Sequence, residues 1–140
     1  MRDEDNMAKR RSAIAENERR FGAEARRRYG DEAVDAANER AWALSDDEWS
    51  EAEALESQII SKLRVAMEAG DVEGPAAREL CQAHARWIEL KWGEGAYSKC
   101  AHAGLARLYV ADERFRAYYD GRAGAGATDF LAEALLRYLA

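Results

Sequence analysis

The segment PAARELCQAHARWIELKW, residues 75–92, has the broadest apolar pattern in the chain. Pro75 suits the first position of a helix, where its missing amide hydrogen removes no helical hydrogen bond. Side chains then follow two neighbouring helical ridges, one through Leu80, His84, Trp87 and Lys91 and the next through Cys81, Ala85, Ile88 and Trp92. Two adjacent ridges make a buried arc broader than the stripe of a surface helix. The segment is therefore predicted to be a central helix.

Helical periodicity extends on both sides of this segment. Further helices are predicted over residues 7–29, 32–44, 46–69, 96–110, 113–120 and 129–139. Ser45 and Glu48 form a capping box ahead of one of them, and Asp31, Asp112 and Thr128 can cap the starts of others. No run of alternating β-branched residues predicts a strand. The sequence thus predicts an all-α fold of six to seven helices.

The same spacing predicts which side chains face inward. They are Met7, Ile14, Phe21, Ala25 and Tyr29; Val34, Ala37, Ala41 and Trp42; Trp49, Leu55, Ile59, Ile60, Leu63, Val65 and Met67; Tyr97, Ala101, Gly104, Leu105 and Leu108; Phe115, Tyr118 and Tyr119; and Leu131, Leu135, Tyr138 and Leu139. Residues 1–6 are charged and are predicted to be a disordered N-terminus, with 7–140 forming a single domain.

Composition narrows the class of function. The net charge of −6 argues against nucleic-acid binding, because phosphate contacts need cations. No stretch of about 18 apolar residues predicts a membrane span, and the N-terminus lacks the apolar core of a signal peptide. Cys81 and Cys100 lie far apart without zinc-site spacing, so no metal or other cofactor is expected. Two lone thiols are typical of the reducing cytosol, and a cytoplasmic location is expected.

The sequence carries no recognisable catalytic pattern. It has no nucleophile elbow, no phosphate-binding glycine loop and no zinc-protease motif, which favours a role that is not enzymatic. A thiol–imidazole pair of Cys100 and His102 is disfavoured, because side chains two residues apart on a helix diverge by about 200°.

Aromatic residues are concentrated in the second half of the chain. They are Trp87, Trp92, Tyr97, Tyr109, Phe115, Tyr118 and Tyr119. Two interpretations stay open: a core built from aromatic rings, or a cleft lined by rings in which Tyr hydroxyls and His nitrogens supply polar groups. A ring-lined cleft suits a planar or macrocyclic ligand, because stacking and area burial need few hydrogen bonds.

One stretch resembles a known family. After His102 come Gly104-Leu105 and then Tyr109-Val110-x-Asp112-x-Arg114-Phe115. This pattern is similar to the signature of the TipAS-type antibiotic-recognition domain. His84-x-x-Trp87 with Trp92, and Phe130-Leu131 with Ala134, resemble the same family. The strong resemblance covers residues 81–139, and a weaker one, through Tyr29-Gly30 and residues 46–49, extends over most of the chain.

The resemblance implies a globin-like bundle with a central cleft for a drug-sized peptide or polyaromatic antibiotic. The expected ligand-binding residues are His84, Trp87, Trp92, Tyr97, Cys100, His102, Tyr109 and Tyr119. Relatives usually follow a MerR-type DNA-binding domain, and drug binding switches the transcription of resistance genes. No such module is recognised in these 140 residues. The chain is therefore expected to sequester its ligand, or to sense it as an effector domain associated with a MerR-type regulator.

Two further expectations concern the mode of binding. Thiopeptide-binding relatives use a cysteine near the Leu-Tyr-Val segment to trap their ligand; here Gly104 stands at that position and Cys100 lies one helical turn earlier. Reversible binding is thus expected rather than covalent capture. The alternative function is a protein-interaction domain that binds a partner helix in the same groove.

Overall fold

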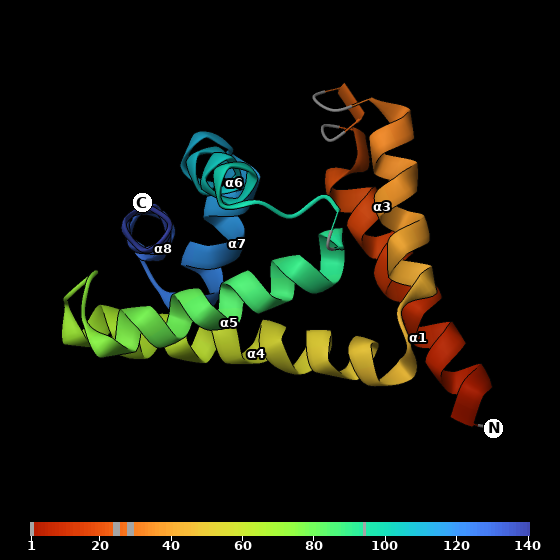
Figure 1. The fold of residues 1–140 in the computed structure, drawn as a ribbon, viewed down its shortest axis with the longest axis horizontal. Helices are drawn as coiled ribbons and strands as arrows, with labels where there is room; N and C mark the ends of the chain where they lie inside the picture. The colour runs from red at the N-terminus through yellow and green to blue at the C-terminus, as the bar shows by residue number, and fades with distance from the viewer. Residues whose placement is uncertain (1, 24–25, 28–29, 94) are drawn as a thin grey trace. The chain divides into compact units, whose positions relative to one another are not determined.

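The computed structural model describes residues 2–23, 26–27, 30–93 and 95–140, and within them the chain is helical without a strand (Figure 1). The elements are α1 (Arg2–Asn17), the π-helical turn η1 (Glu18–Gly22), α3 (Asp31–Ala43), α4 (Asp46–Ala69), α5 (Pro75–Trp92), α6 (Lys99–Ala111), α7 (Glu113–Ala123) and α8 (Ala127–Tyr138). The all-α fold class predicted from the sequence is confirmed.

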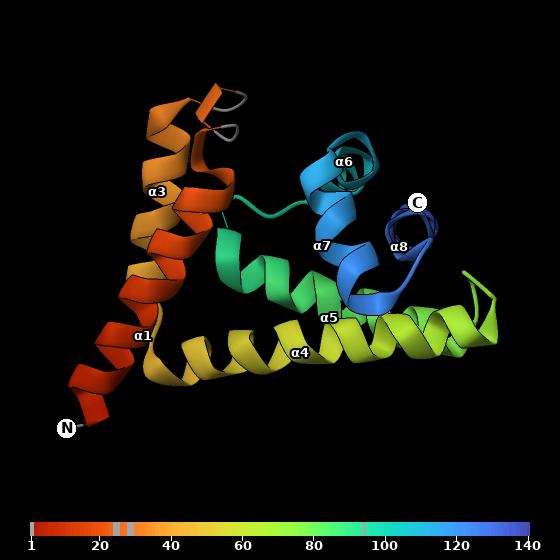
Figure 2. The ribbon, with the colours of Figure 1, turned by 180° about the vertical axis from the view of Figure 1, so that it is seen from behind.

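The helices form two compact units, Met1–Glu51 and Ala52–Ala140, and the boundary falls inside α4. In the C-terminal unit, α4 and α5 lie side by side in opposite directions, as both Figure 1 and Figure 2 show. Helix α8 packs against α5, α6 and α7. The core side chains of the C-terminal unit include Ile59, Leu63, Leu80, Cys81, Leu131 and Leu135, each no more than 2% exposed.

The ends of α4 and α5 agree with the sequence prediction. The Ser45 hydroxyl accepts from the Glu48 amide at 3.1 Å, and the Glu48 carboxylate accepts from the Ser45 amide at 2.9 Å, which is the expected capping box. Helix α5 begins at Pro75 and is followed by Gly93. Gly93 has a φ of 86°, a backbone conformation that residues other than glycine rarely adopt. This conformation lets the chain turn sharply away from the helix.

Two helix starts differ from the prediction. Helix α6 begins at Lys99 rather than at Ala96, because the Ser98 hydroxyl accepts the Ala101 amide at 3.0 Å and so caps that turn. Helix α8 begins at Ala127, and Thr128 is not its cap. The amide and the hydroxyl of Thr128 instead donate to the Asp120 carboxylate, both at 2.8 Å, so this residue links α8 to α7.

Some predicted inward positions are wrong. Met7, Trp42, Val65 and Tyr138 are 46%, 36%, 56% and 41% exposed. In α6 the buried residues are His102, Ala106 and Tyr109, whereas the predicted Ala101 and Gly104 are exposed. The helix is rotated from the predicted face because its two polar rings find hydrogen-bond partners inside the unit. Of the other predicted positions, Ala25 and Tyr29 lie outside the described residues, and the side chains of Phe21, Ala37 and Ala41 are not described.

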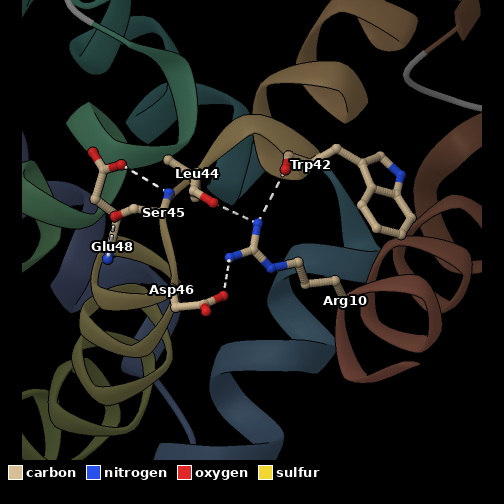
Figure 3. A network of polar contacts seen from close by, with 6 residues as sticks. All are labelled: Arg10, Trp42, Leu44, Ser45, Asp46 and Glu48. Carbon is tan, nitrogen blue, oxygen red and sulfur yellow. Dashed lines mark hydrogen bonds and ion pairs between the residues drawn. The ribbon is translucent and has the colours of Figure 1, made fainter. Parts of the chain in front are cut away.

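In the N-terminal unit α1 packs against α3, and Arg10 fixes the corner between α3 and α4. The Arg10 guanidinium donates to the carbonyl oxygens of Trp42, at 3.0 Å, and Leu44, at 2.5 Å, and also to the Asp46 carboxylate at 3.1 Å (Figure 3). The group lies over the Trp49 ring, 5.0 Å from its centroid, and Arg10 is 3% exposed. The buried Arg10 guanidinium thus donates to carbonyl oxygens at the end of α3. Carbonyl groups at such a helix end have no backbone amide partner within the helix.

Helix α1 begins at Arg2, five positions before the expected start. The disordered N-terminus over 1–6 and the single ligand-binding domain over 7–140 stay predictions. Among the described helices, none combines the length and the apolar character needed to cross a membrane.

Replacing Arg10 by lysine is expected to destabilise α1. Lysine keeps the charge but lacks the planar fork that reaches two carbonyls and a carboxylate together, so the expected loss is about 2 kcal/mol. Hydrogen exchange of the α1 amides in R10K measures this loss locally. The neighbouring exposed Arg11→Lys is the matched control, and equal exchange in both variants would contradict the anchoring role.

Candidate functional site

Two buried histidines form the centre of the candidate site. His84 on α5 and His102 on α6 are both 0% exposed. The Nδ1 atom of His84 lies 2.8 Å from the Nε2 atom of His102, within hydrogen-bond distance, and the two rings are nearly parallel at 10°. This contact joins residues 18 positions apart in the sequence and connects the two helices through polar atoms.

Tyrosines extend the histidine pair at both ends. The Tyr97 hydroxyl lies 3.0 Å from Nδ1 of His102, and the Tyr109 hydroxyl lies 3.0 Å from Nε2 of His84. The Tyr119 ring packs against the Tyr109 ring, with centroids 5.0 Å apart, and its hydroxyl is close enough to influence the pKa of Tyr109. We call this chain of five side chains, Tyr97–His102–His84–Tyr109–Tyr119, the polar relay. It satisfies all four imidazole nitrogens, so neither histidine leaves a buried polar atom without a partner.

Local backbone structure places each member of the relay. His102 and Tyr109 lie seven residues, or two helical turns, apart and therefore share one face of α6. The Tyr97 amide donates to the carbonyl of Gly93 at 3.1 Å, which folds the segment between α5 and α6 back toward the histidines. Tyr119 comes from α7, and its ring lies 5.0 Å from the Tyr109 ring.

Burial keeps the relay uncharged near neutral pH. Burial lowers the pKa of His84 well below its ordinary value, with a smaller contribution from His102, and lowers the pKa of His102 to about 4. Burial also raises the pKa of the Tyr109 and Tyr119 hydroxyls. Loss of water disfavours each charged form, so both imidazoles are neutral and both phenols are protonated.

A group of half-buried aromatic rings lies where the relay approaches the surface. The Trp87 ring meets His84 edge-on, with ring centroids 5.6 Å apart, and the Trp92 ring lies 6.3 Å from Tyr97. The Lys91 ammonium lies over Trp87, 4.4 Å from the ring centroid. We call Trp87, Trp92 and Tyr97 the aromatic edge. These rings keep exposed surface while packing against buried polar groups.

The remaining predicted site residues occupy different environments. Tyr109 and Tyr119 are 2% and 3% exposed and belong to the core, so they reach the aromatic edge only through the histidines. Cys100 is exposed on α6, whereas His102 is buried, which agrees with the predicted divergence of these two side chains. Within the described residues no group of three or more His, Cys, Asp or Glu side chains is placed to hold a metal ion.

A model of the TipAS antibiotic-recognition domain matches residues 21–138. The chain belongs to this family. Neither a curated protein nor a solved structure matches it. The match covers residues 21–51 of the N-terminal unit, nearly all of the C-terminal unit, and every member of the polar relay and of the aromatic edge. Family membership assigns this TipAS domain to the recognition of antibiotics as a ligand-binding sensor.

Sequence reasoning missed two features of this TipAS domain. Lys91 was placed on the ridge of Trp87 without a role, although a position four residues along a helix brings an ammonium over a preceding ring. The second feature is the hydrogen bond from the Tyr118 hydroxyl to Glu56, at 2.9 Å, which joins α7 to α4. Nothing in the periodicity of either helix predicts that pair, because its members are 62 positions apart.

The lowered histidine pKa values predict that the TipAS domain loses stability in mild acid. In the unfolded chain a histidine binds a proton near pH 6.5, whereas in the folded domain His102 does so only near pH 4. Between these values the unfolded state holds more protons than the folded state. The free energy of unfolding therefore decreases as the pH is lowered, by up to about 1.4 kcal/mol per pH unit for each histidine. Urea unfolding from pH 7.5 to 4.5 measures the slope.

Carboxylates titrate in the lower part of the same range, so the histidines need a separate measurement. Ring-carbon NMR signals of His84 and His102 in the folded domain should stay those of neutral imidazole down to pH 5. A ring that becomes protonated between pH 6 and 7 without unfolding would contradict the burial effect.

Proposed function

We propose that this chain binds a drug-sized peptide or polyaromatic antibiotic reversibly, without catalysis, at the aromatic edge. The observation that carries the proposal is the pairing of half-buried rings with the polar relay directly behind them, in a chain that belongs to an antibiotic-recognition family. Ring faces give a large ligand much contact area, and Tyr97 gives it one hydrogen-bonding group.

The indole nitrogen of Trp87 is a second polar group, which lies beneath this surface. Its Nε1 atom is buried and has no hydrogen-bond acceptor among the residues that the structure describes. A buried donor without an acceptor costs about 1–3 kcal/mol, so an acceptor brought by a ligand would recover part of that cost. Trp87 therefore combines a ring for stacking with a donor for a carbonyl oxygen.

A binding role without catalysis is consistent with the chemistry around the edge. The relay imidazoles are neutral, fully buried and hydrogen-bonded at both nitrogens, which leaves neither free to accept a proton from a substrate. The Cys100 thiol is exposed and not part of the relay. The ligand is therefore expected to leave unchanged, and His84, His102, Tyr109 and Tyr119 act by positioning Tyr97 and Trp87.

The biological role that follows is sequestration or sensing of the antibiotic. A domain that holds the antibiotic lowers the free concentration of the drug. As an effector domain associated with a MerR-type regulator, it would couple the presence of the drug to the transcription of resistance genes. Both roles place the chain in the cytoplasm, without direct contact with nucleic acid.

Tryptophan fluorescence of the intact chain gives the first test. Titration with a thiopeptide, a macrolide and a polyaromatic antibiotic is expected to give saturable quenching with at least one compound at micromolar concentration, because Trp87 and Trp92 both belong to the proposed surface. No saturable change with any of the three would overturn antibiotic binding. The alternative, a groove for a partner helix, would then be the favoured function.

Replacing Trp87 by alanine is expected to abolish binding of the compound that quenches. The half-buried ring contributes less to stability than a core tryptophan, so the variant should lose less than the about 3–5 kcal/mol of a core deletion and remain helical. Calorimetry measures binding independently of the deleted fluorophore, and circular dichroism checks the fold. Trp42→Ala is the matched control, since Trp42 lies in the N-terminal unit and is exposed; equal losses in both variants would remove Trp87 from the site.

A further inference from the structure

The two relay histidines share a single hydrogen bond, and this fixes their tautomers relative to each other. A neutral imidazole carries one N–H and one bare nitrogen. Between Nδ1 of His84 and Nε2 of His102 only one proton fits, since the atoms are 2.8 Å apart. If His102 holds it, His84 must carry its own proton on Nε2; if His84 holds it, His102 must carry its own on Nδ1. Both histidines therefore have the same tautomer.

Each shared tautomer assigns a different role to Tyr97. In the Nε2–H state His102 offers a bare Nδ1, the Tyr97 hydroxyl donates to it, and the outward lone pair of Tyr97 can accept a hydrogen bond. In the Nδ1–H state His102 donates to Tyr97, whose O–H then points outward as a donor. At the other end Tyr109 accepts from His84 in the first state and donates to it in the second.

The relay is closed at one end and open at the other. His84, His102, Tyr109 and Tyr119 are each no more than 3% exposed, whereas Tyr97 is half-buried beside Trp92. A hydrogen-bonding group of a ligand can therefore reach the relay through Tyr97.

We propose that Tyr97 is an adaptable hydrogen-bonding group of the ligand site, made donor or acceptor by the joint tautomer of His84 and His102. The proposal rests on the antibiotic-binding function proposed above. Amide-rich, peptide-type ligands are the class that such a hydrogen-bonding group would suit, because a peptide bond offers both a carbonyl acceptor and an N–H donor. Such a ligand can place either group against Tyr97.

The two states contain the same number of protons. Passing from the Nδ1–H to the Nε2–H state, each relay proton moves to its neighbour: from Tyr119 to Tyr109, from Tyr109 to His84, from His84 to His102 and from His102 to Tyr97. The original Tyr97 proton leaves to water, and a proton that enters from water during a local opening of the core replaces the one lost by Tyr119. No heavy atom changes its bonds, and no net charge is created.

Nitrogen-15 NMR of the free protein tests the coupling, since it distinguishes protonated from bare ring nitrogens. Tyr109→Phe removes the acceptor for a His84 Nε2–H, so both histidines should become Nδ1–H, although His102 does not touch position 109. Tyr97→Phe removes the acceptor for a His102 Nδ1–H, so both should become Nε2–H. An N–H without an acceptor costs more than an acceptor without a donor, which gives each shift its direction.

Two more variants keep this test decisive. Tyr119→Phe acts in the same direction as Tyr109→Phe with a smaller change to the core, and it replaces that variant if the latter unfolds. Tyr118→Phe is the control, because the Tyr118 hydroxyl donates to Glu56 and lies outside the relay; it should leave the tautomers as in the unmodified protein. The same tautomer pair in the Tyr97 and Tyr109 variants, or opposite tautomers in any one protein, would overturn the proposal.

Binding of a thiopeptide probe separates this proposal from the proposed function. Tyr97→Phe should weaken binding about tenfold, the worth of one hydrogen bond, while Tyr118→Phe leaves the affinity unchanged. Binding that Tyr97→Phe leaves unchanged would overturn the ligand role of Tyr97 and leave antibiotic binding intact. If neither the thiopeptide nor the macrolide nor the polyaromatic antibiotic binds the unmodified protein, the proposed function is overturned and with it the ligand role of Tyr97, whereas the tautomer measurement still decides the coupling.

Discussion

The hydrogen bond between His84 and His102 is the constraint on which the C-terminal unit depends. Each imidazole is fully buried, and a buried polar atom without a partner is costly in an apolar core. The bond therefore has to form, and it can form only when α5 and α6 present these residues to each other. Once it exists, the remaining ring nitrogens need partners as well, which places Tyr97 at one end and Tyr109 at the other. A network of this kind specifies one arrangement of helices more strictly than apolar packing does.

This constraint explains where sequence reasoning about α6 failed. Apolar periodicity put Ala101, Gly104 and Leu108 on the inner face, because histidine counts as polar in such a pattern. The actual inner face carries His102, Ala106 and Tyr109. His102 and Tyr109 face inward because hydrogen-bond partners for their rings lie there. These partners belong to parts of the chain outside α6. Periodicity measures the average preference of a side chain for water, and it holds no information about a hydrogen-bond partner 18 or 25 positions away.

Features determined by neighbouring residues were, by contrast, predicted well. The limits of α4 and α5 follow from the Ser45–Glu48 box, Pro75 and Gly93, all of which act within one turn. Most predicted site residues also converge, from His84 to Tyr119, although their pairing was unknown. Arg10 marks the opposite case: Lys9, Arg10 and Arg11 look equivalent as charges, yet only Arg10 is buried. Arg10 lies three residues after Met7 and four before Ile14, so it shares the predicted inward face of the helix. That spacing was the available signal, but a charged side chain is ordinarily expected to be exposed.

The combination of an aromatic edge with a relay behind it suggests how one site can accept ligands of differing polarity. Proteins that bind many partners usually adapt by repacking flexible side chains, which moves heavy atoms and disturbs the surrounding core. In the proposed site Trp87 and Trp92 would contribute contact area that depends little on the exact ligand, and the hydrogen bond of Tyr97 would supply the directional part of recognition. In the proposed mechanism the relay reverses its direction by proton transfer, and each ring has the same place in the core before and after the change. Adaptation of this kind requires a dry, fully satisfied interior, which is what the burial of His84, His102, Tyr109 and Tyr119 provides.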